Sequence, residues 1–383
     1  MENVITNNGN LLGQTKERNY GIDLLRIVSM FLVCILHVLG HGGILNNTTE
    51  NTVNYNVAWI MNISAYCAVN CYALISGYVG IKSKFKFSNI VNLWLQVVFY
   101  SGLITVGFGI FKLNLHWSDV VEAFLPVLGQ RYWYFTAYFG LFFFMPIFNL
   151  AINNLNKNVI RACLIILLFL FCFYSLDFGD NFVLKRGFSL LWLAMLYLVG
   201  GYISKYDPLR KIKSHQLVLI VFICILLTWV PRFIIETFHD RVGIFQKLYG
   251  FKDDLILYVS PTITLIAIAL LELFSRFKIN KIKGVITFFA STSFGVYLIH
   301  DNNSVRGTLM INRFAEFASY NPVLMVLAVL GVALGIYLVC SLIDYLRILL
   351  FKALKVKILT QKLENKIKNK FCKEEICSET TEN

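Results

Sequence analysis

Arg26 and His37 lie in one hydrophobic segment near the N-terminus, GIDLLRIVSMFLVCILHVLGHGG. A bilayer interior penalises ionisable side chains, by roughly 2.5–3.5 kcal/mol for Arg on insertion scales. The spacing is close to three helical turns, so both side chains are expected on one helix face, about 16 Å apart along the axis. This placement favours a functional pair over a snorkelling Arg and a His that only packs helices together.

Three of the six histidines are expected at one level of the membrane. His41 follows His37 by one turn, and His300 precedes Asp301 in the late segment SFGVYLIHDNN. A neutral imidazole can take a proton from a hydroxyl near pH 7, and a neighbouring carboxylate can orient it. Asp301 can supply that carboxylate, as can Glu50 in the predicted first external loop. The same groups could ligate zinc, but their spacing fits no metal motif, and we expect no metal.

Asp23 precedes Arg26 by three residues, which allows a salt bridge within one helix. We expect Asp23 to give structural support by fixing the guanidinium at the start of the helix. An Arg fork held there would suit a phosphate or another anionic ligand.

These residues belong to a chain whose composition indicates a membrane protein. Of its 383 residues, 57% are hydrophobic and 15% are charged, with a mean hydropathy of +0.65. Soluble domains carry about 25% charged residues. Lipid cannot satisfy backbone hydrogen bonds, so only helices and closed barrels span it. The apolar runs are longer and more continuous than barrel strands. The predicted fold class is all-α, a polytopic membrane protein.

The hydrophobic runs predict about ten transmembrane helices, each near the 20 residues that cross a bilayer. Their approximate limits are 22–41, 56–79, 89–111, 131–150, 159–176, 187–203, 216–235, 255–275, 285–301 and 322–350. Lys and Arg gather in the N-terminal segment, in alternate loops and in the C-terminal tail, and they are fewer in the other loops. By the positive-inside rule, both termini are predicted to be cytoplasmic, which accounts for the net charge of +13.

The chain divides into three predicted segments. Residues 1–20 form a cytoplasmic N-terminal segment without a signal-peptide cleavage pattern, and residues 21–350 form the transmembrane domain. Residues 351–383 form a basic tail in which Leu359, Leu363, Ile367 and Phe371 recur every four residues. This pattern predicts either an amphipathic helix on the inner leaflet or a soluble charged extension of the last span. The polar end of the tail is predicted to be disordered.

The sequence resembles the acyltransferase-3 family of integral-membrane enzymes, which O-acetylate bacterial surface glycans. In the first span, ten residues separate Arg26 from His37, which is the family's spacing of an Arg and a His. The second span ends in a Ser-Gly-Tyr signature. A central segment resembles the family's Trp-Tyr…Tyr…Pro stretch, and FGVYLIH resembles its Tyr-Leu-x-His ending. The residues that carry these last three motifs are Ser76, Gly77, Tyr78, Trp133, Tyr134, Tyr138, Pro146, Tyr297, Leu298 and His300.

The resemblance implies acetyl-CoA, or another acyl-CoA, as a cytoplasmic donor substrate, with no permanently bound cofactor. It implies a hydroxyl of a cell-surface polysaccharide or lipid-linked glycan as the acceptor, at a bacterial plasma membrane. Arg26 would help to hold the donor. His37, supported by His300, would act as general base on the acceptor or would relay the acyl group. The family's Arg-x-x-Arg after the second span is replaced by lysines, and Lys82, Lys84 and Lys86 would attract the donor or serve only as positive-inside residues.

The remaining motif residues have both functional and structural interpretations. His41, Trp133, Tyr134 and Asp301 are candidates for binding the acceptor, with Arg131 near the same path. The aromatic residues could equally belong to an interfacial belt. Besides Asp23, we expect Ser76, Gly77 and Tyr297 to give structural support, and the Ser-Gly pair could serve only close helix packing.

Two other function classes compete with an acyltransferase. A glycan or lipid transporter, or flippase, would use the same buried charges, but the sequence has no inverted repeat and no matched pair of broken helices. A membrane sensor domain is disfavoured because no enzyme domain is fused to these spans. Partners are expected to be acyl-CoA, a glycan and membrane lipids rather than nucleic acid, although the acceptor hydroxyl, the acyl group and the oligomeric state are not readable from the sequence.

Overall fold

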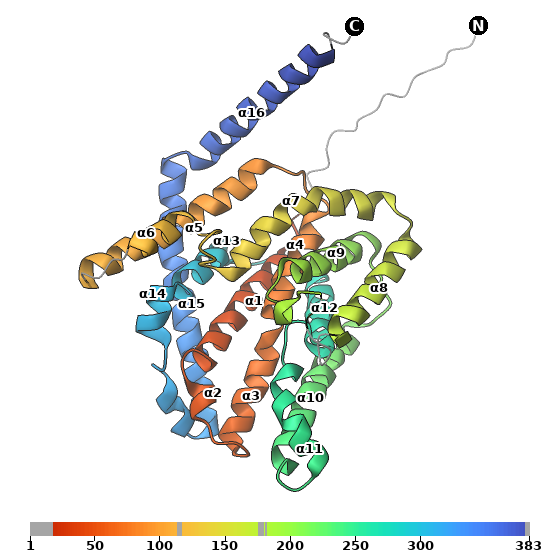
Figure 1. The fold of residues 1–383 in the computed structure, drawn as a ribbon, viewed down its shortest axis with the longest axis vertical. Coiled ribbons are helices and arrows are strands. Elements are labelled where there is room, and N and C mark those ends of the chain that lie inside the picture. The colour runs from red at the N-terminus through yellow and green to blue at the C-terminus, as the bar shows by residue number, and fades with distance from the viewer. Residues whose placement is uncertain (1–17, 113–116, 175–179, 181, 380–383) are drawn as a thin grey trace.

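A computed structural model describes residues 18–112, 117–174, 180 and 182–379, without the side chains of residues 112, 174 and 371–379. The described residues form helices and no strand (Figure 1). This agrees with the predicted all-α class, because long apolar runs in lipid must satisfy their backbone hydrogen bonds within each helix.

Helix α1 (Tyr20–Leu39) is the centre of the bundle. It packs against α3 (Val53–Tyr66), α4 (Ala68–Gly80), α12 (Pro261–Ser275), α13 (Lys283–His300) and α15 (Pro322–Ala353). The side chain of Asn19 caps its first turn by accepting hydrogen bonds from the backbone N–H groups of Gly21 and Ile22. A central helix with so many neighbours holds its functional side chains at fixed positions.

The predicted second span consists of two helices. Cys67 ends α3 and begins α4, and together the two helices cover Val53–Gly80. The sequence does not predict this break, because the apolar run continues through Cys67. Beyond it, α4 packs closely on α9 (Leu190–Tyr206), where a Cβ on Gly77 would lie 1.9 Å from the Tyr197 carbonyl oxygen. The Ser-Gly signature therefore has a packing role at Gly77.

The remaining elements surround this core or connect it. They are α2 (Ile44–Asn47), α5 (Phe87–Lys112), α6 (Trp117–Phe124), α7 (Trp133–Asn154), α8 (Lys157–Tyr174), η1 (Lys185–Gly187), α10 (Ser214–Phe238), α11 (Gly243–Leu248), η2 (Tyr249–Leu255), α14 (Asn303–Val305), η3 (Arg306–Met310), η4 (Ala315–Ser319) and α16 (Val356–Glu379).

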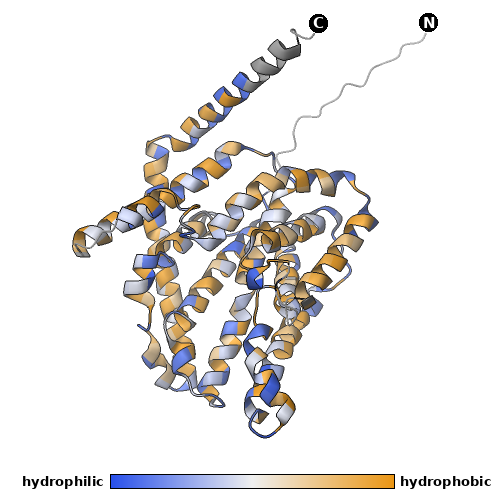
Figure 2. Cartoon of the chain, viewed as in Figure 1, coloured by the Kyte–Doolittle hydropathy of each residue, from blue (hydrophilic) through white to orange (hydrophobic). Residues whose placement is uncertain are grey.

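Among the described residues, six helical segments are long and apolar enough to cross a membrane. They are Tyr20–Asn47, Val53–Gly80, Phe87–Phe111, Trp133–Asn154, Ser214–Phe238 and Pro322–Ala353. Two shorter apolar helices, Leu190–Tyr206 and Pro261–Ser275, also match predicted spans. Hydrophobic residues cover most of these helices, and hydrophilic ones gather around α11 and along α16 (Figure 2). A multi-pass membrane protein is confirmed, whereas the count of ten stays a prediction.

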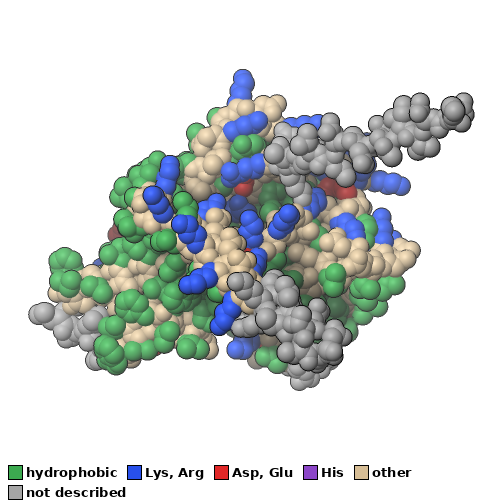
Figure 3. Space-filling model, turned by 90° about the horizontal axis from the view of Figure 1, so that it is seen from above, with side chains coloured by type: hydrophobic (Ala, Val, Ile, Leu, Met, Phe, Trp, Pro, Cys, Tyr) green, Lys and Arg blue, Asp and Glu red, His purple; other side chains and the backbone are tan. Residues whose placement is uncertain are grey.

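One end of the bundle is rich in basic side chains. Figure 3 views the end from which α16 leaves, called the basic end here, and shows many Lys and Arg side chains with few Asp and Glu. α1 begins at this end, and its histidines lie toward the opposite end, where α2 and α11 are found (Figure 1). A basic end is the feature that the positive-inside rule relates to a cytoplasmic face, and the orientation stays a prediction.

Helix α16 holds the predicted basic tail beside α5. The carboxylate of Glu364 accepts hydrogen bonds from the backbone N–H groups of Phe87 and Ser88, and so caps the start of α5. Leu359, Leu363 and Ile367 are exposed. The helix continues to Glu379, past the point where a disordered end is predicted to begin, and residues 380–383 lie outside the described residues.

Candidate active site

Three cavities follow one face of α1, the face that carries Arg26, Met30, Val33 and His37. The inner cavity, nearest the basic end, measures about 250 Å³ and is lined by Arg26, Tyr72, Ser76, Tyr134, Tyr138 and Phe294. The middle cavity measures about 60 Å³ and shares Tyr72, Tyr134 and Phe294 with it. Since successive cavities share walls, they form a series along the helix.

The outer cavity is the largest of the three, at about 780 Å³. It shares His37, Trp133, Tyr258 and Asp301 with the middle cavity, and it extends to a rim of loop residues that includes Lys252. His37 therefore borders two cavities at once. The helical spacing that the sequence predicts for Arg26 and His37 places Arg26 at the inner cavity and His37 between the middle and outer cavities.

His37 and His300 are joined by a direct hydrogen bond. Nδ1 of His37 lies 2.9 Å from Nε2 of His300, and Nδ1 of His300 lies 2.6 Å from the carbonyl oxygen of Val296. His41 contributes a third ring, whose centroid lies 4.9 Å from that of His37. The predicted gathering of three histidines at one level is present.

The hydrogen-bond chain fixes the tautomers of the two neutral rings. A carbonyl oxygen only accepts, so Nδ1 of His300 must donate to Val296, and its Nε2 then carries a lone pair. That lone pair accepts from Nδ1–H of His37. Nε2 of His37 is consequently left unprotonated, which is the form that a general base requires.

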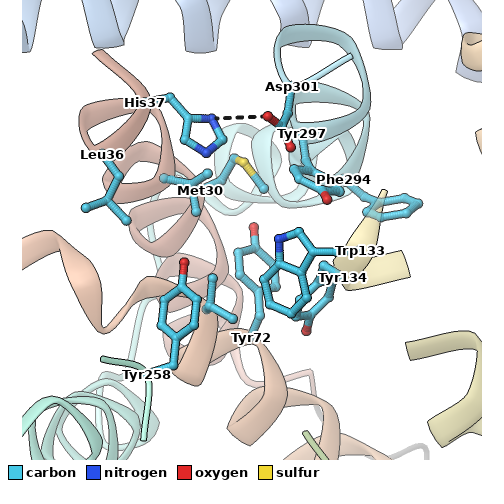
Figure 4. Close-up of a pocket in the computed structure, with 12 residues that line it drawn as sticks. Met30, Leu36, His37, Tyr72, Trp133, Tyr134, Tyr258, Phe294, Tyr297 and Asp301 are labelled. Carbon is cyan, nitrogen blue, oxygen red and sulfur yellow. Dashed lines mark ion pairs between the residues drawn. The ribbon is translucent and has the colours of Figure 1, made fainter. Parts of the chain in front are cut away.

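Asp301 stands beside the same ring. Its carboxylate lies 3.9 Å from Nδ1 of His37 (Figure 4). The same carboxylate lies 2.9 Å from a guanidinium nitrogen of Arg306. A proton gained by His37 would create a cation that this carboxylate stabilises. The ligand atoms of His37, His41 and Asp301 lie within 4.8 Å of one another, so these three could also hold a metal ion.

Glu50, the other carboxylate proposed to orient a histidine, has different partners. It accepts hydrogen bonds from Lys252 at 2.6 Å and from Tyr249 at 2.8 Å. Partial burial alone would raise the pKa of Glu50, but these hydrogen bonds hold it below its ordinary value. Glu50 therefore links the loop after α2 to η2 and does not orient the imidazoles.

Aromatic side chains enclose the middle cavity (Figure 4). Tyr72 and Tyr258 approach from one side, and Trp133, Tyr134 and Tyr297 from the other. The Trp133 ring is stacked on Tyr258, with centroids 6.0 Å apart. The predicted site residues Trp133, Tyr134 and Tyr297 are thus together below His37. Sequence reasoning missed Tyr72 and Tyr258, which stand in no motif beyond their aromatic type.

At the inner cavity, Arg26 is held as the sequence predicts. One of its guanidinium nitrogens donates to Asp23 at 2.9 Å, and Arg18 donates to the other oxygen of that carboxylate. The side chain of Arg26 is 30% exposed. Ser76 lines the same cavity, so the Ser-Gly signature contributes one residue to a cavity wall and one to helix packing.

Other predicted residues lie away from these cavities. Lys82, Lys84 and Lys86 are exposed on the loop between α4 and α5, outside the lining of the inner cavity. Arg131 does not line the outer cavity, because its buried guanidinium donates to Thr105 at 2.7 Å. Its position close to Trp133 in sequence does not bring it to the same wall.

The apolar helical bundle, with a hydrogen-bonded pair of histidines beside its series of cavities, defines a membrane protein that holds titratable groups within its core. Residues 19–345 match the family described as Acyltransferase domain, and the chain belongs to this acyltransferase-3 family. The family identifies a membrane acyltransferase. No curated protein and no solved structure shows significant similarity to the chain.

Proposed function

We propose that the protein transfers an acetyl or similar short acyl group from cytoplasmic acyl-CoA to a hydroxyl of a cell-surface glycan or lipid-linked precursor. The observation that carries this proposal is the chain Val296–His300–His37, which leaves a basic nitrogen on the residue shared by the middle and outer cavities. The donor would enter from the basic end past Arg26, and the acceptor would occupy the outer cavity.

The chemistry follows from this arrangement. Nε2 of His37 takes the proton of the acceptor hydroxyl as its oxygen attacks the thioester carbonyl. The C–S bond then breaks, and the CoA thiolate leaves and regains a proton to form the free thiol. Asp301 stabilises the imidazolium that exists between these proton transfers. In the alternative relay, Nε2 itself attacks the thioester carbonyl and expels the CoA thiolate. The acceptor hydroxyl then attacks the acyl carbon of the acyl-imidazole, displaces the imidazole of His37 and gives up its proton, which leaves CoA as the free thiol.

The size of the middle cavity supports a short acyl group. A water-sized group needs about 10–15 Å³ on this scale. The roughly 60 Å³ of the middle cavity thus suits the few heavy atoms of an acetyl group. The same narrowness disfavours a transporter, because a sugar ring would not pass between Tyr72, Tyr134 and Tyr297 without their displacement.

The deciding experiment measures transfer of label from radiolabelled acetyl-CoA by purified protein in liposomes, with cell-envelope glycan as acceptor. We expect labelled glycan from the unaltered protein, a loss of at least about 100-fold with His37→Ala, and no loss with His215→Ala, which alters an exposed histidine. Arg26→Ala should raise the KM for acetyl-CoA. Arg26→Lys should raise this KM less, because Lys keeps the positive charge but lacks the guanidinium fork.

Omission of the acceptor separates the two chemical routes. Label retained on the protein and lost with His37→Ala would support the acyl-histidine relay, whereas its absence during rapid transfer would support direct attack. If no envelope fraction gains label while the protein remains folded, the proposed acyltransferase reaction is wrong.

A further inference from the structure

A buried carboxamide in the outer cavity has no partner in the protein. Asn62 is 6% exposed, lines this cavity and makes no hydrogen bond with any described residue. Its amide oxygen and nitrogen both keep surface that a ligand can reach, whereas Nε1 of Trp59 and Nε of Arg232, also in the lining, are sealed. Polar groups inside a membrane protein are costly unless they are paired, so Asn62 indicates a place where a ligand completes the hydrogen bonds.

The spacing of residues on α3 turns Asn62 toward the cavity. Four residues of this helix line the cavity, and they recur every three or four positions, as a single helix face requires. They are Tyr55, Trp59, Asn62 and Tyr66. The guanidinium carbon of Arg232 lies 3.5 Å from the centre of the Trp59 ring, and one of its nitrogens donates to the Tyr55 hydroxyl at 3.0 Å. These contacts hold the first two residues of the face in place and leave Asn62 and Tyr66 to meet a ligand.

Aromatic rings extend from Asn62 toward the middle cavity. Tyr66 follows Asn62 by one turn, and its ring centroid lies 4.8 Å from that of Tyr258, which is stacked on Trp133. The hydroxyls of Tyr66 and Tyr258 also make no hydrogen bond with a described residue. Figure 4 shows the Tyr258 hydroxyl turned toward His37. Rings that combine an apolar face with a polar tip suit a sugar, which has apolar faces and hydroxyls at its edge.

The charges around the cavity decide what kind of sugar fits. Each of the four Lys and Arg residues in its lining is ion-paired with a carboxylate. The pairs are Arg186–Asp254, Arg232–Glu236, Lys252–Glu50 and Arg306–Asp301. Asp253, the remaining carboxylate of the lining, also contacts Arg232. Among the described lining residues, an acidic sugar would therefore find no unpaired Lys or Arg, and an amino sugar would find no unpaired carboxylate.

We propose that Asn62 selects an uncharged sugar as the acceptor by pairing with two adjacent hydroxyls. A carboxamide accepts through its oxygen and donates through its nitrogen, so it accepts a hydrogen bond from one hydroxyl and donates one to the next. The sugar ring lies along Tyr66 and Tyr258, which lead toward His37. This inference rests on the proposed function, since it names the acceptor of that reaction, and it makes Asn62 a specificity residue.

The test compares two asparagines of α3. Asn62→Leu replaces the amide by an apolar group of similar size. Asn56→Leu is the matched control, because the Asn56 amide lies outside the cavity lining, donates to the Thr52 carbonyl at 2.9 Å and accepts from Nε1 of Trp229 at 3.2 Å. Calorimetry without acyl-CoA would measure binding of neutral oligosaccharides of glucose, galactose and mannose, and of charged oligosaccharides of glucuronic acid and glucosamine. Melting temperatures and transfer from acetyl-CoA would be measured separately.

We expect the unaltered protein to bind at least one neutral probe about tenfold more tightly than either charged probe. Asn62→Leu should weaken binding of that probe about tenfold and raise the melting temperature, because it removes a buried amide that has no partner. Asn62→Ala should weaken binding equally, which separates loss of the amide from obstruction by Leu. Asn56→Leu should leave binding unchanged and lower the melting temperature, because Trp229 loses its acceptor.

The subsite is wrong if a charged probe binds best, if no neutral probe binds, or if Asn62→Leu leaves binding unchanged. A fall in melting temperature for Asn62→Leu as large as that for Asn56→Leu would assign Asn62 to the support of the fold and overturn the inference. Binding that depends on Asn62, without transfer to any neutral glycan, would refute the acyltransferase reaction while supporting the subsite.

Discussion

Nδ1 of His37 lies 2.9 Å from Nε2 of His300, although 263 positions separate them in the sequence. Packing of α1 on α13 creates this contact. The end of α13 is tied further by the Tyr132 hydroxyl, which donates to the Leu298 carbonyl at 2.8 Å and accepts from the Asn302 amide. The contact therefore belongs to a rigid part of the core, and its chemistry can be tested by changing one ring at a time.

We expect His300 to act as a positioning residue through its hydrogen bond to His37. His300→Ala removes the acceptor for Nδ1–H of His37, so both the tautomer and the ring orientation are lost. We expect kcat to fall about 100-fold with little change in the KM for acetyl-CoA. His300→Gln places an amide oxygen near the lost Nε2 and should recover part of kcat. Steady-state kinetics of acetyl transfer would test this.

An equal loss in His300→Ala and His300→Gln, or an effect confined to KM, would contradict a role through this hydrogen bond. His215→Ala provides the control, since that side chain is exposed at the start of α10.

The sequence predicts this part of the site well because helix geometry and membrane direction are both readable from it. Arg26 and His37 share a helix face by spacing alone, and the direction of the spans places His300 near His37. Arg232 and Trp59 escape such reasoning, because their contact depends on how α10 packs against α3. The only local signal is the i,i+4 pair of Arg232 and Glu236 within an apolar helix.

The motif signature on α4 shows a similar division. Ser76 and Gly77 are recognisable as a pair, but the sequence cannot tell which residue faces a cavity and which faces a helix. Gly77→Ala would place a Cβ 1.9 Å from the carbonyl oxygen of Tyr197, and backbone on both sides prevents relief. We expect a destabilisation of about 3 kcal/mol and poor recovery of folded protein.

Gly107→Ala in α5 is the matched control, because a Cβ there has nothing within 4 Å. It should be neutral or slightly stabilising, since Ala favours a helix by about 1 kcal/mol over Gly. Thermal unfolding followed by fluorescence would compare the two variants, and equal melting temperatures would refute the close contact of α4 and α9.

The ion pair of Glu50 with Lys252 predicts a pH dependence of stability. The pKa of Glu50 is lowered, so its contribution is complete above the ordinary value of 4.5 and is lost as the pH falls through the lowered value. Burial would lower the pKa of Lys252, but hydrogen bonding to Glu50 raises it overall above 10.5, so the contribution of the lysine is lost only at still higher pH. The stabilisation of the fold by this ion pair should be constant between about pH 5 and 10.

Glu50→Gln should lower the melting temperature by about 1–3 °C throughout that range, a small effect because the carboxylate is 36% exposed. The difference between variant and unaltered protein should shrink below about pH 4, where the carboxylate of the latter becomes protonated. A difference that grows on acidification would contradict this assignment.

The middle cavity predicts which acyl groups are accepted. Met30 is 4% exposed and lies on the α1 face between Arg26 and His37, at the wall of this cavity. Met30→Ala should enlarge the cavity and raise the ratio of butyryl to acetyl transfer by about tenfold, because one methylene in a tight apolar pocket is worth about 1–3 kcal/mol. Competition between the two acyl-CoA donors would measure the ratio directly.

Met325→Ala, which deletes the same volume from a fully buried position of α15 outside the cavity, should cost stability and leave the ratio unchanged. If both variants alter the ratio alike, general loosening of the bundle explains the selectivity, and the middle cavity does not hold the acyl group.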